Sequence, residues 1–178
     1  GLVLPPRLAP IQAVIVPIWK TLEEKQTVLE TAVHLKQQLV TAKVRVHLDD
    51  TEQKTPGWKY NYWEMKGVPL RIELGPRDLA QGTVILARRD IPGRDGKIMG
   101  IAFAQVPESV QSLLIEIQVA MLKRATEFRD ANIHDIKSYE ELEAVCLQGG
   151  WARGWWSGSD EDELRIKEKL GVTIRCFP

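Results

Sequence analysis

The stretch from Gly57 to Lys66 has the residue types that hold unpaired RNA bases. It places four aromatic rings and two lysines close together: Trp58, Tyr60, Tyr62, Trp63, Lys59 and Lys66. Aromatic side chains stack on splayed bases while lysines neutralise phosphates, which is a common way to bind single-stranded RNA. Aromatic residues at helical spacing also form hydrophobic cores. Both interpretations are open at this point.

Other polar positions give weaker signals. Arg88, Arg89 and Asp90 precede Gly93 to Gly96, a pattern typical of a strand end and a hairpin loop, although the arginines can equally contact phosphates. The three histidines lack metal-ligand spacing, and no phosphate-binding glycine loop, GxSxG elbow or nucleophilic cysteine motif occurs. The residue pattern therefore indicates no catalytic residues in this chain.

The charge balance argues against indiscriminate binding to nucleic acid. The chain has 24 Lys and Arg against 24 Asp and Glu, so there is no global basic field. The basic excess is local, with nine Lys and Arg against five Asp and Glu between residues 54 and 103. Two distant cysteines favour a reduced, cytoplasmic setting. No apolar run approaches the ~20 residues of a membrane span, so we expect no membrane partner.

Alternating strands and helices predict an α/β domain over residues 11–131. Ile11 to Ile18 is a nearly continuous β-branched run, typical of a central strand covered on both faces, and Thr21 with Glu24 forms a capping box that begins a helix. Further strands are predicted over 43–48, 68–74 and 83–88, with a short helix between the second and third strands and a long helix over 107–130. We expect a parallel or mixed sheet flanked by helices.

The residues on either side of this domain predict a connector and a small second domain. Residues 1–10 contain three prolines and are typical of an extended connector. Beyond residue 131, cap residues predict two helices, a strand near 151–156 and a terminal strand over 172–177; the caps are Ser138 with Glu141 and Ser159 with Asp162. Residues 132–178 should therefore form a small α+β domain.

Two long segments carry a family resemblance. GLVLPPRLAPIQAVIVPI at residues 1–18 and TPGWKYNYWEMKGVPLRIELGPRDLAQGTVILARRD at residues 55–90 closely resemble prolyl-tRNA synthetases of the archaeal and eukaryotic type. The resemblance extends over essentially the whole chain. It implies the class II synthetase anticodon-binding fold, with a mixed five-stranded sheet, followed by the family's small C-terminal domain. It also implies proline tRNA as the partner.

The same resemblance places the family's catalytic chemistry outside this chain. Members ligate proline to its tRNA with ATP and Mg²⁺, using motifs upstream of the segment that resembles GLVLPP. We therefore expect a fragment that is inactive alone and needs no cofactor, cut from a parent that is a homodimer through the missing catalytic domain. An interaction or regulatory fragment that keeps the fold without reading tRNA is the alternative. An independent small-molecule enzyme is disfavoured by the missing motifs.

The resemblance further implies an anticodon surface on the WEMKG segment and on the LRIELGPRD strand and turn. Carboxylates and cations there can read base edges, and guanine, which occurs twice in proline anticodons, offers donors and acceptors to both. The candidate anticodon-binding residues are Lys59, Glu64, Lys66, Arg71, Glu73, Arg88 and Arg89.

The tail departs from the family at its zinc ligands. Many relatives hold a structural zinc with two cysteine pairs, but Ser157 and Asp162 replace the first pair, and the second would lie beyond Pro178. A tetrahedral zinc site needs about four good ligands. We therefore expect no metal site in this chain.

The chain should consequently fold without zinc. Elemental analysis of the purified protein should find zinc well below one equivalent, and a chelator should leave the midpoint of thermal unfolding unchanged, because one aspartate and a distant cysteine cannot complete the coordination. Stoichiometric zinc, or a lower midpoint after chelation, would contradict this expectation.

Overall fold

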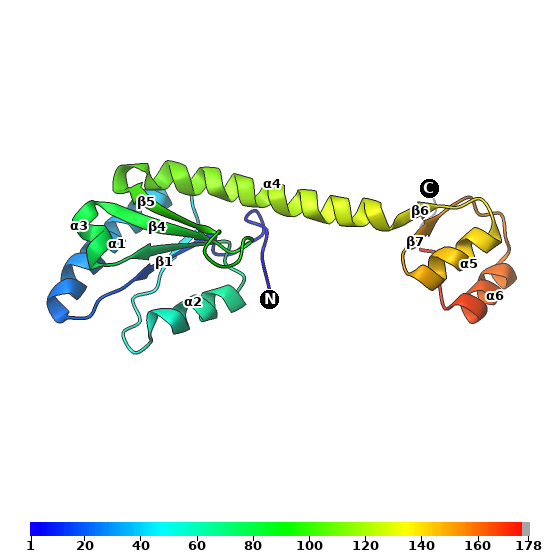
Figure 1. Ribbon diagram of the computed structural model, residues 1–178, viewed down its shortest axis with the longest axis horizontal. Helices are drawn as coiled ribbons and strands as arrows, with labels where there is room; N and C mark the ends of the chain where they lie inside the picture. Colours follow the sequence, from blue (N-terminus) through cyan, green and yellow to red (C-terminus); the bar gives the residue numbers. More distant parts are fainter. Residues whose placement is uncertain (176–178) are drawn as a thin grey trace. The chain divides into compact units, whose positions relative to one another are not determined.

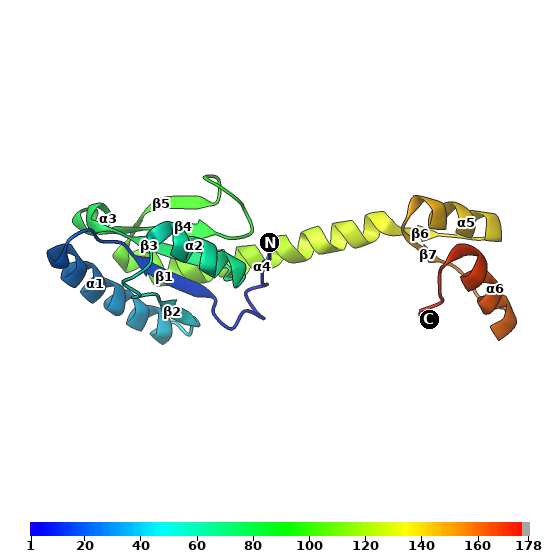
Figure 2. The same cartoon turned by 90° about the horizontal axis from the view of Figure 1, so that it is seen from below.

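The computed structural model describes residues 1–175, in two compact units that divide after Leu122. The first unit contains a five-stranded sheet in the order β2-β1-β3-β4-β5 (Figure 2), in which β1 runs parallel to β2 and β3, and β4 runs antiparallel to β3 and β5. The mixed five-stranded α/β fold is therefore confirmed. The strands are β1 (Ala13–Pro17), β2 (Val46–Leu48), β3 (Leu70–Leu74), β4 (Thr83–Arg88) and β5 (Lys97–Ala102).

Strand β1 is the centre of the hydrophobic interior. It lies between β2 and β3, and successive side chains point to opposite faces of the sheet. Ala13 and Ile15 face the larger core, whereas Val14 and Val16 belong to a smaller core on the other face. All four side chains are fully buried, which confirms the prediction of a strand covered on both faces.

Helices cover both faces of the sheet. Figure 1 shows α4 (Val106–Asn132) on one side and α2 (Pro56–Met65) on the other. Helix α1 (Leu22–Thr41) packs on the same core as α4 and begins at the predicted capping box, where the Glu24 N–H donates to Thr21 Oγ1 at 3.2 Å. The apolar stripes predicted for α1 and α4 supply the larger core: Val28, Ala32, Leu35, Leu39, Val106, Val110, Leu113, Leu114 and Ile117.

The segment after β3 contains elements that the sequence pattern did not predict. Helix α3 (Pro76–Gln81) is short, strand β5 carries Gly100 in its interior, and a 3₁₀ turn (Phe103–Gln105) leads into α4. The predicted hairpin loop lies between β4 and β5. A Cβ atom on Gly96 would lie 2.2 Å from the Ile91 carbonyl oxygen, so the loop requires glycine at this position.

The connector over residues 1–10 forms no helix or strand but is bound to the first unit. The Arg45 guanidinium donates to the carbonyl oxygens of Ala9 and Pro6, each at 2.9 Å. At the other end of the connector, the Leu4 N–H donates to the Gly67 carbonyl at 3.0 Å. These bonds hold the connector beside the end of α2.

The second unit is a small α+β arrangement with little interior. Strands β6 (Ile133–Asp135) and β7 (Trp151–Arg153) form a parallel pair, and α5 (Tyr139–Gln148) and α6 (Asp160–Leu170) begin at the predicted serine caps. From residue 123 to residue 175 no side chain is fully buried. The predicted terminal strand is wrong over Val172–Arg175, which is irregular, and its last two positions, Cys176 and Phe177, lie outside the described residues.

A buried ion pair fastens α2 to the sheet of the first unit. Lys59 and Asp49 are only 2% and 4% exposed. The Lys59 ammonium lies 3.4 Å from Asp49 Oδ1 and donates to the Asp49 carbonyl at 2.9 Å, while Trp63 Nε1 donates to Asp49 Oδ2 at 2.7 Å. Because Asp49 directly follows β2, these contacts fix the rotation and height of α2 over the sheet.

The environment of Asp49 keeps its carboxylate ionised. Burial raises its pKa, but hydrogen bonds from Trp63 and Thr51 and the charge of Lys59 outweigh burial, so the pKa of Asp49 lies below its ordinary value of 3.8. A lowered pKa in the folded state means that the stabilisation is fully present above the ordinary pKa. It is lost as the pH falls through the folded pKa.

Asp49→Asn should lower the free energy of unfolding at neutral pH by about 3–5 kcal/mol, because the Lys59 charge stays buried without its partner. Urea unfolding, followed by amide exchange of β1, measures this loss. The difference from the unchanged protein should shrink as the pH falls below 3.8.

The neighbouring Asp50, which is exposed, provides the control. Asp50→Asn should leave the free energy of unfolding at neutral pH nearly unchanged. A loss for Asp49→Asn that does not depend on pH would contradict an ionised carboxylate.

Candidate nucleic-acid interface

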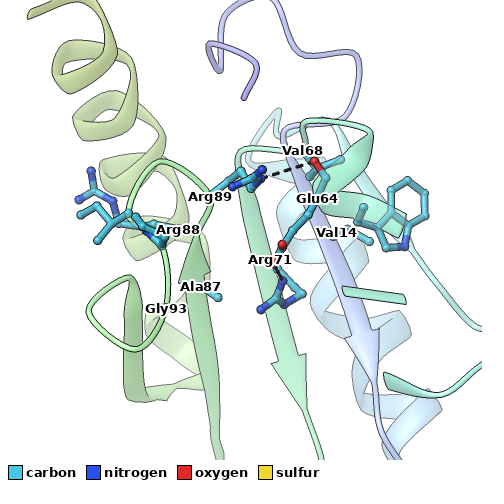
Figure 3. A pocket seen from close by; sticks show the side chains of 11 residues that line it. Val14, Glu64, Val68, Arg71, Ala87, Arg88, Arg89 and Gly93 are labelled. Carbon is cyan, nitrogen blue, oxygen red and sulfur yellow. Dashed lines mark hydrogen bonds and ion pairs between the residues drawn. The ribbon is translucent and has the colours of Figure 1, made fainter. Parts of the chain in front are cut away.

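A shallow cavity opens where the end of α2, strand β3 and the β4–β5 loop meet. Its volume is about 100 Å³, and Figure 3 shows Glu64, Arg71 and Arg89 gathered around it. Both charged and apolar side chains form its wall: Val14, Trp63, Glu64, Val68, Arg71, Ala87, Arg88, Arg89, Ile91, Pro92 and Gly93. The cavity brings together side chains from β1, from α2 and β3, and from the end of β4 with the loop that follows it.

Arg71 organises the carboxylates of this cavity. It donates to Glu64 Oε1 at 2.9 Å and to Glu73 Oε1 at 3.0 and 3.1 Å. Lys97 donates to the other oxygen of Glu73 at 2.9 Å. The Glu73 side chain is 6% exposed, whereas that of Glu64 is 41% exposed. Glu73 is therefore a buried structural anion, and Glu64 is the carboxylate that a ligand can reach.

The Tyr60 ring packs against Arg71 of this cluster. The Arg71 guanidinium carbon lies 3.9 Å from the centre of the Tyr60 ring, a stacked cation–π contact. Burial first, and then the negative charge of Glu73, raises the pKa of Tyr60 well above its ordinary value. The phenol therefore stays protonated. The Tyr60 ring contacts one face of the Arg71 guanidinium, which restricts rotation of the guanidinium.

The two neighbouring arginines of the β4 end have different roles. Arg88 donates to both oxygens of Asp90 at 3.1 and 3.0 Å and to Glu116 of α4 at 3.1 Å, and the hydrogen bond to Asp90 raises the pKa of Arg88. Figure 3 shows Arg88 directed toward α4 and Arg89 toward Glu64, to whose carbonyl oxygen Arg89 makes a long contact of 3.5 Å. Arg88 therefore supports the fold, and Arg89 faces the cavity.

Of the remaining candidates, Lys59 lies on α2 and Lys66 is the residue that caps its end. Lys59 is in the buried ion pair with Asp49 and does not reach the cavity, whereas Lys66 is exposed, with its ammonium 5.5 Å from the centre of the Tyr62 ring. Sequence reasoning did not propose Lys97 for this site. Its strand was not predicted, so nothing indicated that it returns to Glu73.

Metal and membrane features are absent from the part of the chain that the structure describes. Within residues 1–175, no group of three or more His, Cys, Asp or Glu side chains is placed to hold a metal ion. None of the helices in that range is both long and apolar enough to cross a bilayer.

Residues 12–113 match the protein family described as "Anticodon binding domain". The match covers more than half of the chain and includes every residue of the cavity wall. The chain belongs to the anticodon-binding domain family. Membership implies that this anticodon-binding domain binds tRNA, and it places the cavity within the domain that carries that role.

Similar proteins are proline–tRNA ligases. The chloroplastic/mitochondrial proline–tRNA ligase of Arabidopsis thaliana is 56% identical over 180 residues, covering 100% of this chain and 33% of the relative. The proline–tRNA ligases of Chloroflexus aggregans and Roseiflexus sp. are 48% and 44% identical, and each covers 100% of this chain and 36% of the relative. The chain thus spans about a third of the length of these relatives and corresponds to their anticodon-binding region.

Arg71→Met should destabilise the first unit, because Glu73 is left buried with Lys97 as its remaining charged partner. We expect a loss of roughly 2–3 kcal/mol, somewhat below the ~3–5 kcal/mol of a buried pair broken outright. Urea unfolding followed by amide exchange of β1 measures it. Lys25→Met, which breaks the more exposed ion pair with Glu52, should cost less than about 1 kcal/mol; equal losses would show that Arg71 contributes no more than a surface charge.

Proposed function

We propose that this chain is the anticodon-reading part of a proline–tRNA ligase and that the cavity at Glu64 receives the edge of an anticodon base. The observation that carries the proposal is a reachable carboxylate, held in place by Arg71, inside the region that matches the anticodon-binding family. The cavity is small, with a volume of about 100 Å³, and we infer that it takes the polar edge of a base.

Guanine is the base that fits these groups. Its Watson–Crick edge presents two neighbouring N–H donors to a carboxylate such as Glu64, and its O6 and N7 atoms accept from an arginine such as Arg89. Proline anticodons contain two guanines. Arg71 acts through Glu64, which it orients, and Glu73 acts through Arg71. Lys59 and Arg88 support the helix and the strand that carry these groups.

The activity of the longer protein is part of the same proposal. By analogy with its relatives, it ligates proline to tRNA with ATP and Mg²⁺, and it is a homodimer through a catalytic domain outside this chain. This chain contributes tRNA recognition and takes no cofactor of its own. We propose the archaeal and eukaryotic sequence type only from the resemblance of the TPGWK and WEMKG segments; the similar proteins named above are bacterial and plant organellar.

The compartment follows from the proposed reaction. A tRNA ligase works where proteins are synthesised, which is the cytoplasm or, as the name of the Arabidopsis thaliana relative states for that protein, a chloroplast or mitochondrion. We propose the cytoplasm for this chain, on the basis of its cysteine usage.

Glu64→Gln should reduce the preference for a proline-tRNA anticodon stem-loop over one whose two guanines are replaced. The expected loss of discrimination is about 1–3 kcal/mol, because an amide presents a donor where guanine needs a second acceptor. Binding titrations with both stem-loops measure it, and Glu30→Gln, on α1 at the opposite face of the sheet, is the control.

The outcomes separate the alternatives. If Glu64→Gln weakens both stem-loops equally, Glu64 does not read a base. If the unchanged chain shows no preference for the cognate stem-loop, the interaction or regulatory interpretation replaces anticodon reading.

A further inference from the structure

Helix α2 carries a second surface that the cavity does not use. Trp58 and Tyr62 stack on each other with 5.2 Å between ring centres and 11° between ring planes. The two residues are 44% and 37% exposed, although large aromatic residues are usually mostly buried. A lysine approaches each ring: the Lys54 ammonium lies 4.7 Å from the Trp58 ring and the Lys66 ammonium 5.5 Å from the Tyr62 ring. We call Lys54, Trp58, Tyr62 and Lys66 the α2 ridge.

The α2 ridge lies on a different flank of the helix from the cavity. Lys59 and Trp63 face the sheet. With about 100° of rotation per residue, Tyr60 and Glu64 project to one side of that buried line, and Trp58 and Tyr62 project to the other. Within α2, the spacing of four residues places Trp58 and Tyr62 on the same side of the helix, while Lys54 precedes the helix and Lys66 caps its end. A ligand on the ridge is therefore distinct from a base edge in the cavity.

The charge on the ridge is positive and available. Within residues 1–175 the only interactions found for the ammonium groups of Lys54 and Lys66 are the ring contacts. The rings restrict the motion of both lysines, while the N–H donors directed away from the rings stay open to solvent. Restricting long side chains before binding lowers the entropy that binding costs.

We propose that the α2 ridge binds phosphates of the tRNA backbone while the cavity reads a base. This inference rests on the proposed function, since both surfaces belong to the same helix and would contact the same RNA. Charge complementarity favours a polyanion, and the lysines act as point charges that carry no base information. The stacked rings hold the lysines in place and are themselves positioning residues.

The test compares salt dependence with base discrimination. The double variant Lys54→Ala/Lys66→Ala should bind a full-length proline tRNA more weakly at low salt. Raising the salt from about 50 to 200 mM weakens binding by both proteins. The factor of weakening should be roughly ten times larger for the unchanged chain, because the double variant lacks two phosphate contacts. Its preference for the cognate anticodon over the guanine-replaced anticodon should stay unchanged.

Two further variants complete the design. Trp58→Leu/Tyr62→Leu keeps both lysines but removes the rings, so affinity should fall about two- to fivefold with a nearly unchanged salt slope. Lys36→Ala removes a lysine of α1, which covers the other face of the sheet, and should change neither quantity.

The result separates the ridge from the cavity. If the lysine double variant binds tRNA with an unchanged salt slope and unchanged discrimination, the ridge does not bind phosphates. The proposed function would still stand, and an acidic protein would then be the partner to examine. Absence of any tRNA binding by the unchanged chain would instead overturn the proposed function. Unchanged affinity of the ring variant would overturn the positioning role of Trp58 and Tyr62.

Discussion

The arrangement of the recognition surfaces depends on a charge pair inside the first unit. Burying Lys59 and Asp49 costs several kcal/mol per ion unless each finds a full set of partners. Here the carboxylate accepts from the Trp63 indole and the Thr51 backbone, and the ammonium donates to the Asp49 carbonyl. A hydrophobic contact would allow α2 to rotate or slide, whereas these directional bonds fix it. The fixed helix then places Glu64 at the cavity and Trp58 with Tyr62 on the opposite flank.

Much of the fold could be predicted because its signals are local. The apolar run of β1, the capping box of α1 and the periodicity of α4 each follow from neighbouring residues, and each was confirmed. Strand β5 escaped prediction because Gly100 breaks its apolar alternation and its pairing partner β4 lies across a loop. The prediction of a terminal strand failed because the local pattern was present without a partner strand. Val172–Arg175 has strand-forming residues, but strand formation needs a partner edge, and a sequence pattern does not supply one.

The sequence proposed seven candidate residues without assigning their individual roles. Four of them, Glu64, Arg71, Glu73 and Arg89, lie close together in the structure. The sequence could not distinguish Arg88 from Arg89, because part of the difference arises from Glu116, 28 residues away on α4. Lys59 looked like the other lysines of an aromatic, basic stretch. Its burial depends on Asp49, whose position beside α2 is a consequence of sheet order and not of spacing along the chain.

The same charge pair restricts how this domain can change in evolution. Losing Asp49 alone or Lys59 alone leaves an unpaired charge in the interior, so a sequence that replaces the pair must pass through a destabilised intermediate or change both positions together. Trp63 is restricted in the same way, since its indole donor bonds the same carboxylate. Exposed positions such as Met65 carry no such coupling. Neutral drift should therefore be slow along the buried side of α2 and fast on its outer side, apart from residues that contact RNA.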